Sequence, residues 1–343
     1  MNLPCPSPIK LRLFVRSCLR LLFQGTAVLG SLTFLSLGLG TAWAQGNYPA
    51  RAVTLVVGYP PGGSTDLTAR TVGAELSNRL GVPVVIENVG GAGGTIGAQK
   101  VANASPDGYT LLVGANNEVA ISRLVTASVK YEMKDFTPLG LIASQPMVLV
   151  ASQKSGVKNV EQFISLVKAN PGKFSYGSSG VGSALHLAGE MVKEQSGLFM
   201  THIPYRGVAP LANDLLGNNI EFGVFVLSSG LPHIKSGKLV ALGTTQAARS
   251  AVTPDIPALA ESAKLKGIDI SSWFVLMGPA RLPEAVAATL RKALADSLQS
   301  PDLRKKLEDS GSAIAPLNVD MPKFLASETA KYKKIVDFAG IRE

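Results

Sequence analysis

The segment Val53–Arg70 constrains the fold of this chain more than any other, because it joins a buried strand to a helix through a loop with few side chains. Its first residues form an uninterrupted apolar run, which is typical of a strand buried on both faces of a parallel sheet. Apolar residues then recur at helical spacing as far as Leu80. We expect Ser64 or Thr65 to cap this helix, with Asp66 in its first turn.

A corner of this kind brings unsatisfied backbone N–H groups to a place where no bulky side chain intervenes. Such helix starts bind anions, either a carboxylate or a phosphate. We expect Gly63 to adopt a positive φ there, which a β-branched residue tolerates poorly. The alternative is a tight turn between strand and helix without any ligand, and geometry alone leaves both readings open.

Residues 1–44 have the pattern of a cleaved secretory signal peptide. Four basic residues precede an apolar core from Leu21 to Gly40, and Ala42-Trp43-Ala44 supplies a small-residue cleavage site. The core is rich in Gly, Ser and Thr, which favours cleavage over an uncleaved membrane anchor. Both cysteines of the chain, Cys5 and Cys18, lie in this segment, so the exported protein is expected to have neither disulfides nor thiol chemistry.

Removal of four basic residues and no acidic ones lowers the formal charge of the chain from +9 to +5. This mild excess, without a basic block, does not fit a nucleic-acid-binding protein and weakly favours acidic ligands. The remaining 299 residues suffice for two domains, and no low-complexity linker divides them. We therefore expect two lobes that meet closely.

The order of predicted elements indicates an α/β protein. Strands predicted at 53–57, 84–88 and 109–114 alternate with helices, which implies a parallel sheet with right-handed crossovers. Ligands of such sheets gather at the carboxyl ends of the strands. Two further strands, Leu139–Ala143 and Met147–Ala151, are expected before a second α/β set begins.

The second set repeats the opening pattern, because a strand ending at Gly177 runs into the Gly/Ser loop Ser178–His186 and then a helix that Ser183 can cap. Two such corners suggest a ligand held between two lobes. The C-terminal helices have no strands of their own, so we expect residues 271–343 to return to the lobe that holds Val53. The predicted lobes are 45–145 with 271–343, and 146–270, joined by two chain crossings.

Other functions find little support in the sequence. The glycine run at 90–94 has the wrong spacing for a dinucleotide fingerprint, and the chain lacks a phosphate loop. Ser183 and His186 would lie on one helix face, but the nucleophile-elbow pattern and an orienting acid are missing, so a hydrolase or transferase is a weak alternative. Without clustered cysteines and histidines we expect no metal site and no cofactor.

Several short motifs, taken together, resemble one known family. They include Tyr59–Asp66, Gly91–Gly97, Pro106–Leu112, Gly182–Glu190 and His202–Gly207, and they recur in the family order over essentially the whole mature chain. On these residues the chain is similar to the Bug-type extracytoplasmic solute receptors of tripartite tricarboxylate transporters.

The resemblance implies a periplasmic-binding-protein-like fold, in which each of two lobes has a mostly parallel central sheet flanked by helices. It further implies a monomeric periplasmic receptor, not an enzyme, that closes on a small carboxylate and offers it to membrane permease subunits. A receptor that instead feeds a sensor kinase would look identical in sequence. The implied ligand-binding residues are Tyr59, Pro61, Gly62, Gly63, Ser64, Thr65, Asp66, Ala115, Asn116, Asn117, Ser178, Ser179, Gly180, Ser183, His186 and Tyr205.

Two departures from the family pattern bear on the ligand. Glu118 stands in a stretch where relatives often have a different sequence, and an acidic group there would repel an acid or pair with an amine if it lined the pocket. Phe222–Phe225 lacks the Phe-Asp pair that is common in relatives. This apolar replacement argues against a simple amino acid or citrate as the ligand.

Overall fold

The computed structural model describes residues 48–341. The predicted signal peptide, residues 1–44, lies outside the described residues. None of the helices between residues 48 and 341 has both the length and the apolar character needed to cross a bilayer. From Pro49 onward the chain forms a single compact unit.

The strands of this unit form one mixed sheet with the order β2-β1-β3-β9-β4-β7-β5-β6, and β8 and β10 also pair with β4. The strands are β1 (Val53–Val57), β2 (Val84–Asn88), β3 (Thr110–Ala115), β4 (Phe136–Ser152), β5 (Ser175–Ser178), β6 (Thr201–Pro204), β7 (Phe222–Val226), β8 (Leu239–Thr244), β9 (Ser271–Pro279) and β10 (Ala313–Ile314).

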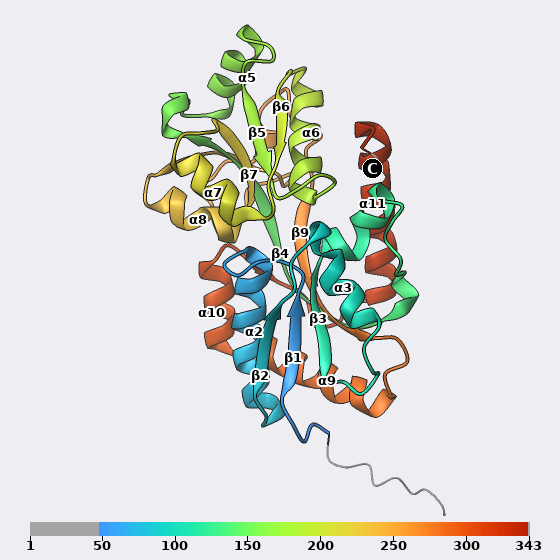
Figure 1. The fold of residues 1–343 in the computed structure, drawn as a ribbon. Coiled ribbons are helices and arrows are strands. Elements are labelled where there is room, and N and C mark those ends of the chain that lie inside the picture. The colour runs from blue at the N-terminus through green and yellow to red at the C-terminus, as the bar shows by residue number, and fades with distance from the viewer. Residues whose placement is uncertain (1–47, 342–343) are drawn as a thin grey trace, which may run out of the picture. The chain divides into compact units, whose positions relative to one another are not determined.

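Helices cover this sheet along its length (Figure 1). The α-helices are α2 (Ser64–Leu80), α3 (Thr95–Ala102), α4 (Ser122–Val125), α5 (Val160–Ala169), α6 (Ala184–Ser196), α7 (Val208–Leu216), α8 (Leu227–Lys235), α9 (Glu284–Leu298), α10 (Pro301–Asp309) and α11 (Met321–Ala339). A short π-helix, η2 (Asn117–Ile121), follows β3, and 3-10 turns lie at η1 (Ala92–Gly94), η3 (Met133–Asp135), η4 (Gln153–Ser155) and η5 (Leu259–Glu261).

The central strand β4 corrects one sequence prediction. Two strands with a break at Ser144–Pro146 were expected, but β4 is one strand of 17 residues. The break is absent because Ser144 and Gln145 pair with β9. The buried Gln145 side chain also donates to Ser312 Oγ over 2.6 Å and accepts from the Ser228 backbone N–H over 3.0 Å. These partners satisfy the hydrogen-bonding groups of the buried Gln145 side chain, in a stretch whose polar residues suggest a turn when the sequence is read alone.

The sheet has two halves that share β4. In the first half β1, β2 and β3 are parallel, and β9 joins them antiparallel to β3 and β4. In the second half β5, β6 and β7 are parallel, while β7 and β8 run antiparallel to β4. Each half is therefore parallel at its outer strands, as predicted, and the strands that join the halves at β4 are antiparallel, so the whole sheet is mixed.

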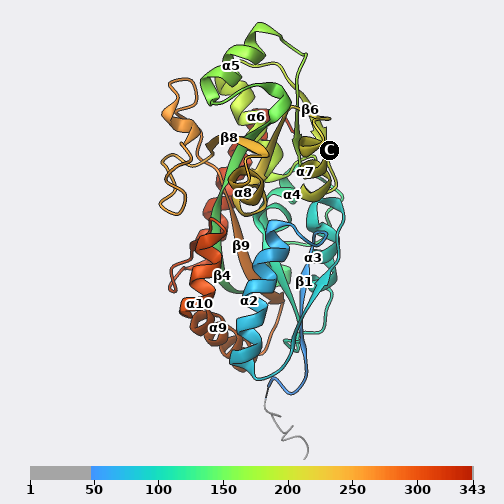
Figure 2. The ribbon, with the colours of Figure 1, turned by 90° about the vertical axis from the view of Figure 1, so that its left-hand side faces the viewer.

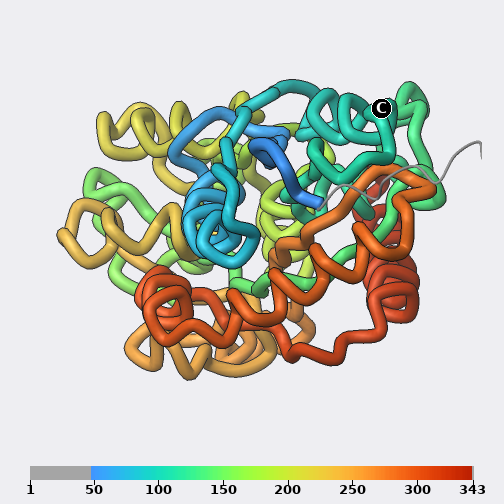
Figure 3. The backbone as a smooth tube through the Cα atoms, turned by 90° about the horizontal axis from the view of Figure 1, so that it is seen from below, coloured from blue at the N-terminus to red at the C-terminus, as the bar shows by residue number. Residues whose placement is uncertain are grey.

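The C-terminal helices pack against the first half and extend beyond it. Helix α9 packs on α2 and β4, and α10 packs on α2, whereas α3 covers β1, β3 and β9 (Figures 2 and 3). Helix α11 touches η2 and α4 in the first half and α6 in the second. Trp273 of β9 is almost fully buried and donates from its indole nitrogen to Glu328 of α11 over 2.8 Å.

Tyr332 fixes α11 to the sheet and is expected to contribute strongly to stability. Its hydroxyl donates to the Ser271 carbonyl over 2.9 Å and accepts from Asn116 Nδ2 over 2.6 Å, and the side chain is fully buried. Tyr332→Phe removes both bonds, so the free energy of unfolding in urea should fall by about 1–3 kcal/mol.

Tyr205→Phe is the matched control for this substitution, because the Tyr205 hydroxyl donates to Asp214 at the surface over 2.7 Å. It should cause a smaller loss of stability than Tyr332→Phe. Equal losses for the two variants would contradict the structural role assigned to Tyr332.

Candidate functional site

Two adjoining cavities lie where the two halves of the sheet meet. The first, here called the inner pocket, has a volume of about 50 Å³. The second, here called the outer chamber, has a volume of about 740 Å³. Five residues line both cavities and mark the boundary between them. They are Tyr59, Pro60, Asn117, Ser179 and Gly207.

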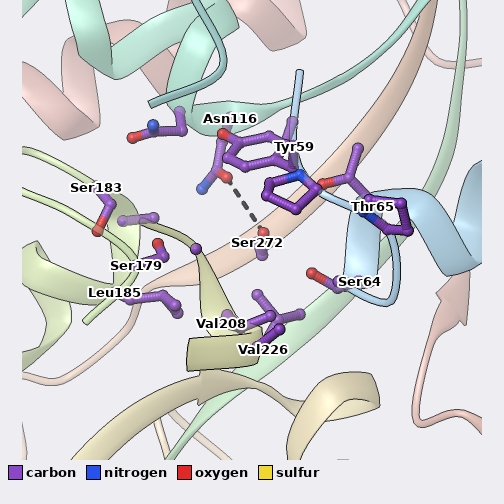
Figure 4. Close-up of a pocket in the computed structure, with 18 residues that line it drawn as sticks. Tyr59, Ser64, Thr65, Asn116, Ser179, Ser183, Leu185, Val208, Val226 and Ser272 are labelled. Atoms are coloured by element: carbon purple, nitrogen blue, oxygen red, sulfur yellow. Dashed lines mark hydrogen bonds between the residues drawn. The ribbon is translucent and has the colours of Figure 1, made fainter. Parts of the chain in front are cut away.

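The inner pocket is formed where three helices begin. Residues at the first turns of α2, α6 and α7 line it, and these helices have 17, 13 and 9 residues. Figure 4 shows Ser64 and Thr65 on one side of the pocket and Ser179 and Ser183 on the opposite side. None of the residues that line the pocket carries a charged side chain. The groups at the pocket that can attract an anion are therefore helix dipoles and free N–H groups, not Lys or Arg side chains.

The start of α2 differs from the sequence prediction in two respects. Gly63 is the N-cap, no side chain caps the helix, and the capping role expected for Ser64 or Thr65 is wrong. The backbone N–H groups of Ser64 and Thr65 have no hydrogen-bond partner among residues 48–341. Gly63 has φ −79°, while Gly62 has the positive φ of +86°. The uncapped start leaves these donors free for a ligand.

Asp66 does not line the pocket, but its hydrogen bonds hold the loop before α2 in place. Its carboxylate accepts hydrogen bonds from Gly62 N, Arg70 Nε and Asn88 Nδ2, each over 2.9 Å. Burial raises the pKa of Asp66, but the hydrogen bonds from Arg70, Gly62 and Asn88 outweigh it, and the pKa is lowered overall. The charged carboxylate therefore holds the Gly62 turn in place.

The start of α6 forms the opposite side. Ser183 is the N-cap, as expected, and its Oγ accepts from the His186 backbone N–H over 3.2 Å. The N–H groups of Ala184 and Leu185 have no partner within the described part of the chain. Ser183 Oγ also donates to the Gly180 carbonyl over 2.8 Å, which closes the loop before the helix.

The His186 side chain packs against this loop and does not line the inner pocket. Its Nδ1 accepts from the Gly182 N–H over 3.0 Å, and its ring stacks on His202 with centroids 3.7 Å apart. Ser178 Oγ in turn lies 2.7 Å from His202 Nε2. Burial, followed by the neighbouring His186 ring, lowers the pKa of His202 to about 3, so the His202 ring stays neutral. The two imidazoles and Ser178 fix the loop that carries Ser179 and Ser183.

The start of α7 is a third element of the pocket. Gly207 is its N-cap, at φ +103°, and no side chain caps the helix. The N–H groups of Val208 and Ala209 have no partner in residues 48–341. The side chains of Val208 and Val226 form an apolar wall below Ser272 in Figure 4. The pocket thus combines backbone donors with an apolar surface.

Asn116 and Asn117 form the side of the pocket after β3. Asn116 Oδ1 accepts from Ser272 Oγ over 3.2 Å, and its amide nitrogen contacts Tyr332 on α11. Asn117 Nδ2 donates to the Gly93 carbonyl over 2.6 Å, while its buried Oδ1 has no partner among the described residues. An unpaired buried acceptor at the boundary of the two cavities is available to a hydroxyl or another donor.

The structure brings most of the predicted site residues together. Ten of them line the inner pocket: Tyr59, Pro61, Gly63, Ser64, Thr65, Ala115, Asn116, Asn117, Ser179 and Ser183. Two others, Gly180 and Tyr205, line the outer chamber. Gly62, Asp66, Ser178 and His186 line neither cavity and instead hold the two loops in shape.

Eight residues of the inner pocket were not predicted from the sequence. They are Pro60, Ala184, Leu185, Gly207, Val208, Ala209, Val226 and Ser272. The α7 start was detectable, because strand β6 and Gly207 before a helix repeat the pattern of the two recognised corners. Val226 and Ser272 gave no such signal, since their position depends on the pairing of β7 and β9 with β4.

Glu118 lies behind the pocket and contributes to its shape through Tyr59. The side chain is fully buried, and its carboxylate accepts from Tyr59 Oη over 2.6 Å and from Ala115 N over 2.7 Å. Burial raises the pKa of Glu118 to about 7, although these two hydrogen bonds oppose the shift. Glu118 lines neither cavity, so its position does not support the direct ligand contact that was considered from the sequence.

Between residues 48 and 341 no group of three or more His, Cys, Asp or Glu side chains is arranged to hold a metal ion.

A scan against family models matches residues 68–341 to the tripartite tricarboxylate transporter family receptor. The chain belongs to this receptor family. Protein BugT of Bordetella pertussis (strain Tohama I) is 31% identical over 319 residues, which cover 92% of this chain and 97% of BugT.

Solved structures of similar proteins have the same fold. The periplasmic binding protein BugD is 32% identical with a TM-score of 0.81, over 86% of this chain and 99% of BugD. Rpa4515 of R. palustris, solved with adipate, is 33% identical with a TM-score of 0.83 over the same shares of the two chains. The chain therefore has an α/β fold of the periplasmic-binding-protein type.

Glu118 predicts a specific pH dependence of stability. Unfolded glutamate has a pKa of about 4.3, whereas burial raises that of folded Glu118 to about 7. Between these values the folded chain binds more protons than the unfolded chain, so this group lowers stability as the pH rises. Glu118→Gln should therefore lose less stability than wild type between pH 5 and pH 8, by on the order of 1–3 kcal/mol in urea unfolding.

Glu87→Gln serves as the control, because Glu87 is half-exposed and pairs with Lys100 at the surface. Glu118→Gln should change the dependence of stability on pH more than this surface substitution does. The assignment to Glu118 fails if Glu118→Gln keeps the full wild-type slope over the same pH range.

Proposed function

We propose that the mature chain is a periplasmic solute-binding protein that holds a small carboxylate in the inner pocket and delivers it to a membrane permease. The observation that carries this proposal is the convergence of three helix starts, with free N–H groups, on a pocket without charged side chains. Such donors favour an anion and disfavour an ammonium group, which would find no acidic partner in the lining.

The charge of the carboxylate would be held by the first turns of α2 and α6. Each helix start carries roughly half a positive charge, and the free donors are those of Ser64 and Thr65 on one side and of Ala184 and Leu185 on the other. The adipate in the related R. palustris protein is a ligand of the proposed class.

The lobes of this receptor are proposed as residues 45–145 with 271–343, and residues 146–270. The supporting observation is that the first half of the sheet supplies the α2 corner and the second half supplies the α6 and α7 corners. In this division β4 and the start of β9 are where the chain crosses between lobes. Export with removal of residues 1–44 and action as a monomer complete the proposal.

A binding role is also favoured over hydrolysis or group transfer. Ser183 Oγ contacts the backbone N–H of His186, not its ring, and the ring Nδ1 is already occupied by the Gly182 N–H. The other ring nitrogen, Nε2, lies 3.7 Å from Glu190 Oε1, and the Ser183 hydroxyl donates to the Gly180 carbonyl. The hydroxyl and the ring therefore lack the hydrogen bond that general-base activation of a serine nucleophile uses. These two residues serve the loop, which leaves the hydrolase alternative without a nucleophile–base pair at this place.

Calorimetry tests the function directly. The mature chain is titrated with butanedioate, hexanedioate and the uncharged diamides of both acids. We expect at least one acid to bind more than about 10-fold more tightly than its diamide, since charge-assisted hydrogen bonds are worth about 1.5–3 kcal/mol each. Binding of the diamides with equal affinity, or of amino acids in preference to acids, would contradict a carboxylate pocket.

Gly63→Val tests the location of the carboxylate. A Cβ at Gly63 would lie 3.5 Å from Val208 Cγ2, an ordinary contact, and φ −79° suits any residue, so the variant should fold. Its methyl groups would occupy the pocket, and we expect hexanedioate binding to weaken by roughly 10-fold or more. Ser64→Ala, by contrast, should cost only about 0.5–1.5 kcal/mol, because most of the donors are backbone groups.

Calorimetry with circular dichroism as the folding check distinguishes these outcomes. Gly63→Ala provides the graded control, because it adds only the Cβ. Wild-type affinity in a folded Gly63→Val variant would mean that the carboxylate binds elsewhere.

A further inference from the structure

The inner pocket is too small to hold a long acid by itself. Its volume is about 50 Å³, and one water molecule needs roughly 10–15 Å³ of such space. This space suits a carboxylate with a short stem. The outer chamber of about 740 Å³ shares five lining residues with the pocket and is the adjoining space for the rest of a longer ligand.

The outer chamber has walls suited to a polar end group. One wall is the glycine-rich segment 90–94, and the others are the loops 179–182 and 204–207 with the hydroxyl-bearing residues Ser122, Thr126 and Ser128. Among the residues that line the chamber, Arg206 is the only one with a charged side chain. Arg206 directly precedes Gly207, which lines both cavities, and the Arg206 side chain is exposed.

Arg206 also stands out because its guanidinium forms no ion pair with the described part of the chain. Between residues 48 and 341 there are nine arginines, and seven of them form ion pairs with Asp or Glu. The two exceptions are Arg206 and Arg281. Only Arg206 lines one of the two cavities, because Arg281 lies in the turn between β9 and α9.

We propose that the outer chamber is a second anion subsite, in which Arg206 recognises a second carboxylate at the far end of the solute. This rests on the proposed function, since the first carboxylate is placed in the inner pocket. A guanidinium matches a carboxylate with two parallel hydrogen bonds, which gives direction as well as attraction. The receptor then selects linear diacids by length, because one end is fixed at the helix starts and the other must reach Arg206.

The arrangement makes the two ends of the ligand chemically distinct. At the inner end the carboxylate meets backbone donors and no cation, and at the outer end it meets a cation beside solvent. A monoacid of the same length satisfies only the inner end. An unpaired arginine that merely attracted anions would instead speed the association of all acids, with no preference for a second carboxylate.

The test uses calorimetry on the mature chain with matched ligands and matched variants. The probes are straight-chain diacids of five to nine carbons, each compared with its monomethyl ester, which keeps the length and removes one charge. We expect wild type to bind the best diacid roughly 10-fold more tightly than its ester, and Arg206→Gln to abolish most of this difference. Arg281→Gln, which changes the other unpaired arginine, should retain it.

The outcomes separate the two proposals. If Arg206→Gln weakens diacid and ester equally, or leaves the diacid preference intact, the second subsite is wrong while the inner carboxylate site stands. If wild type binds the esters as tightly as the diacids, the second subsite is again wrong. If wild type binds neither the diacids nor their esters, both the proposed function and the second subsite are wrong.

Discussion

Backbone N–H groups without partners are the constraint on which the rest of this site depends. Three helices start at one small pocket, and the first donors of each remain free within the described chain. Buried polar groups are normally satisfied, so free donors facing a cavity are stabilised when an anion or water supplies the missing acceptor. Because no charged side chain lines the pocket, the proposed binding of a carboxylate depends on how the helix starts are placed.

The placement of these helix starts follows from the sheet. The long strand β4 runs through both halves and pairs with β7, β8, β9 and β10, so the two halves have one common element. Charged and aromatic groups then fix the corners from outside the pocket: Asp66 at the first corner, and His186 stacked on His202 at the second. Their ionisable groups shape the loops without adding charge to the lining.

Local patterns in the sequence predicted much of this arrangement, and long-range pairing accounts for the rest. The strand–loop–helix corners at Tyr59–Asp66 and Ser178–His186 were recognisable, because glycine, proline and small polar residues punctuate them. The cap was mistaken because the free start of α2 is a glycine, whose role depends on loop geometry rather than residue type. The unbroken β4 was missed because Ser144 and Gln145 look like a turn until their partners in β9, β10 and α8 are known.

A crystal structure of the mature protein with bound hexanedioate tests the central claim most directly. One carboxylate should lie at the start of α2 or α6, with its oxygens about 2.7–3.2 Å from the backbone nitrogens of Ser64 and Thr65 or of Ala184 and Leu185. No lysine or arginine should contact that carboxylate. A ligand whose inner end is uncharged, with its only carboxylate contacts made by basic side chains, would contradict the account.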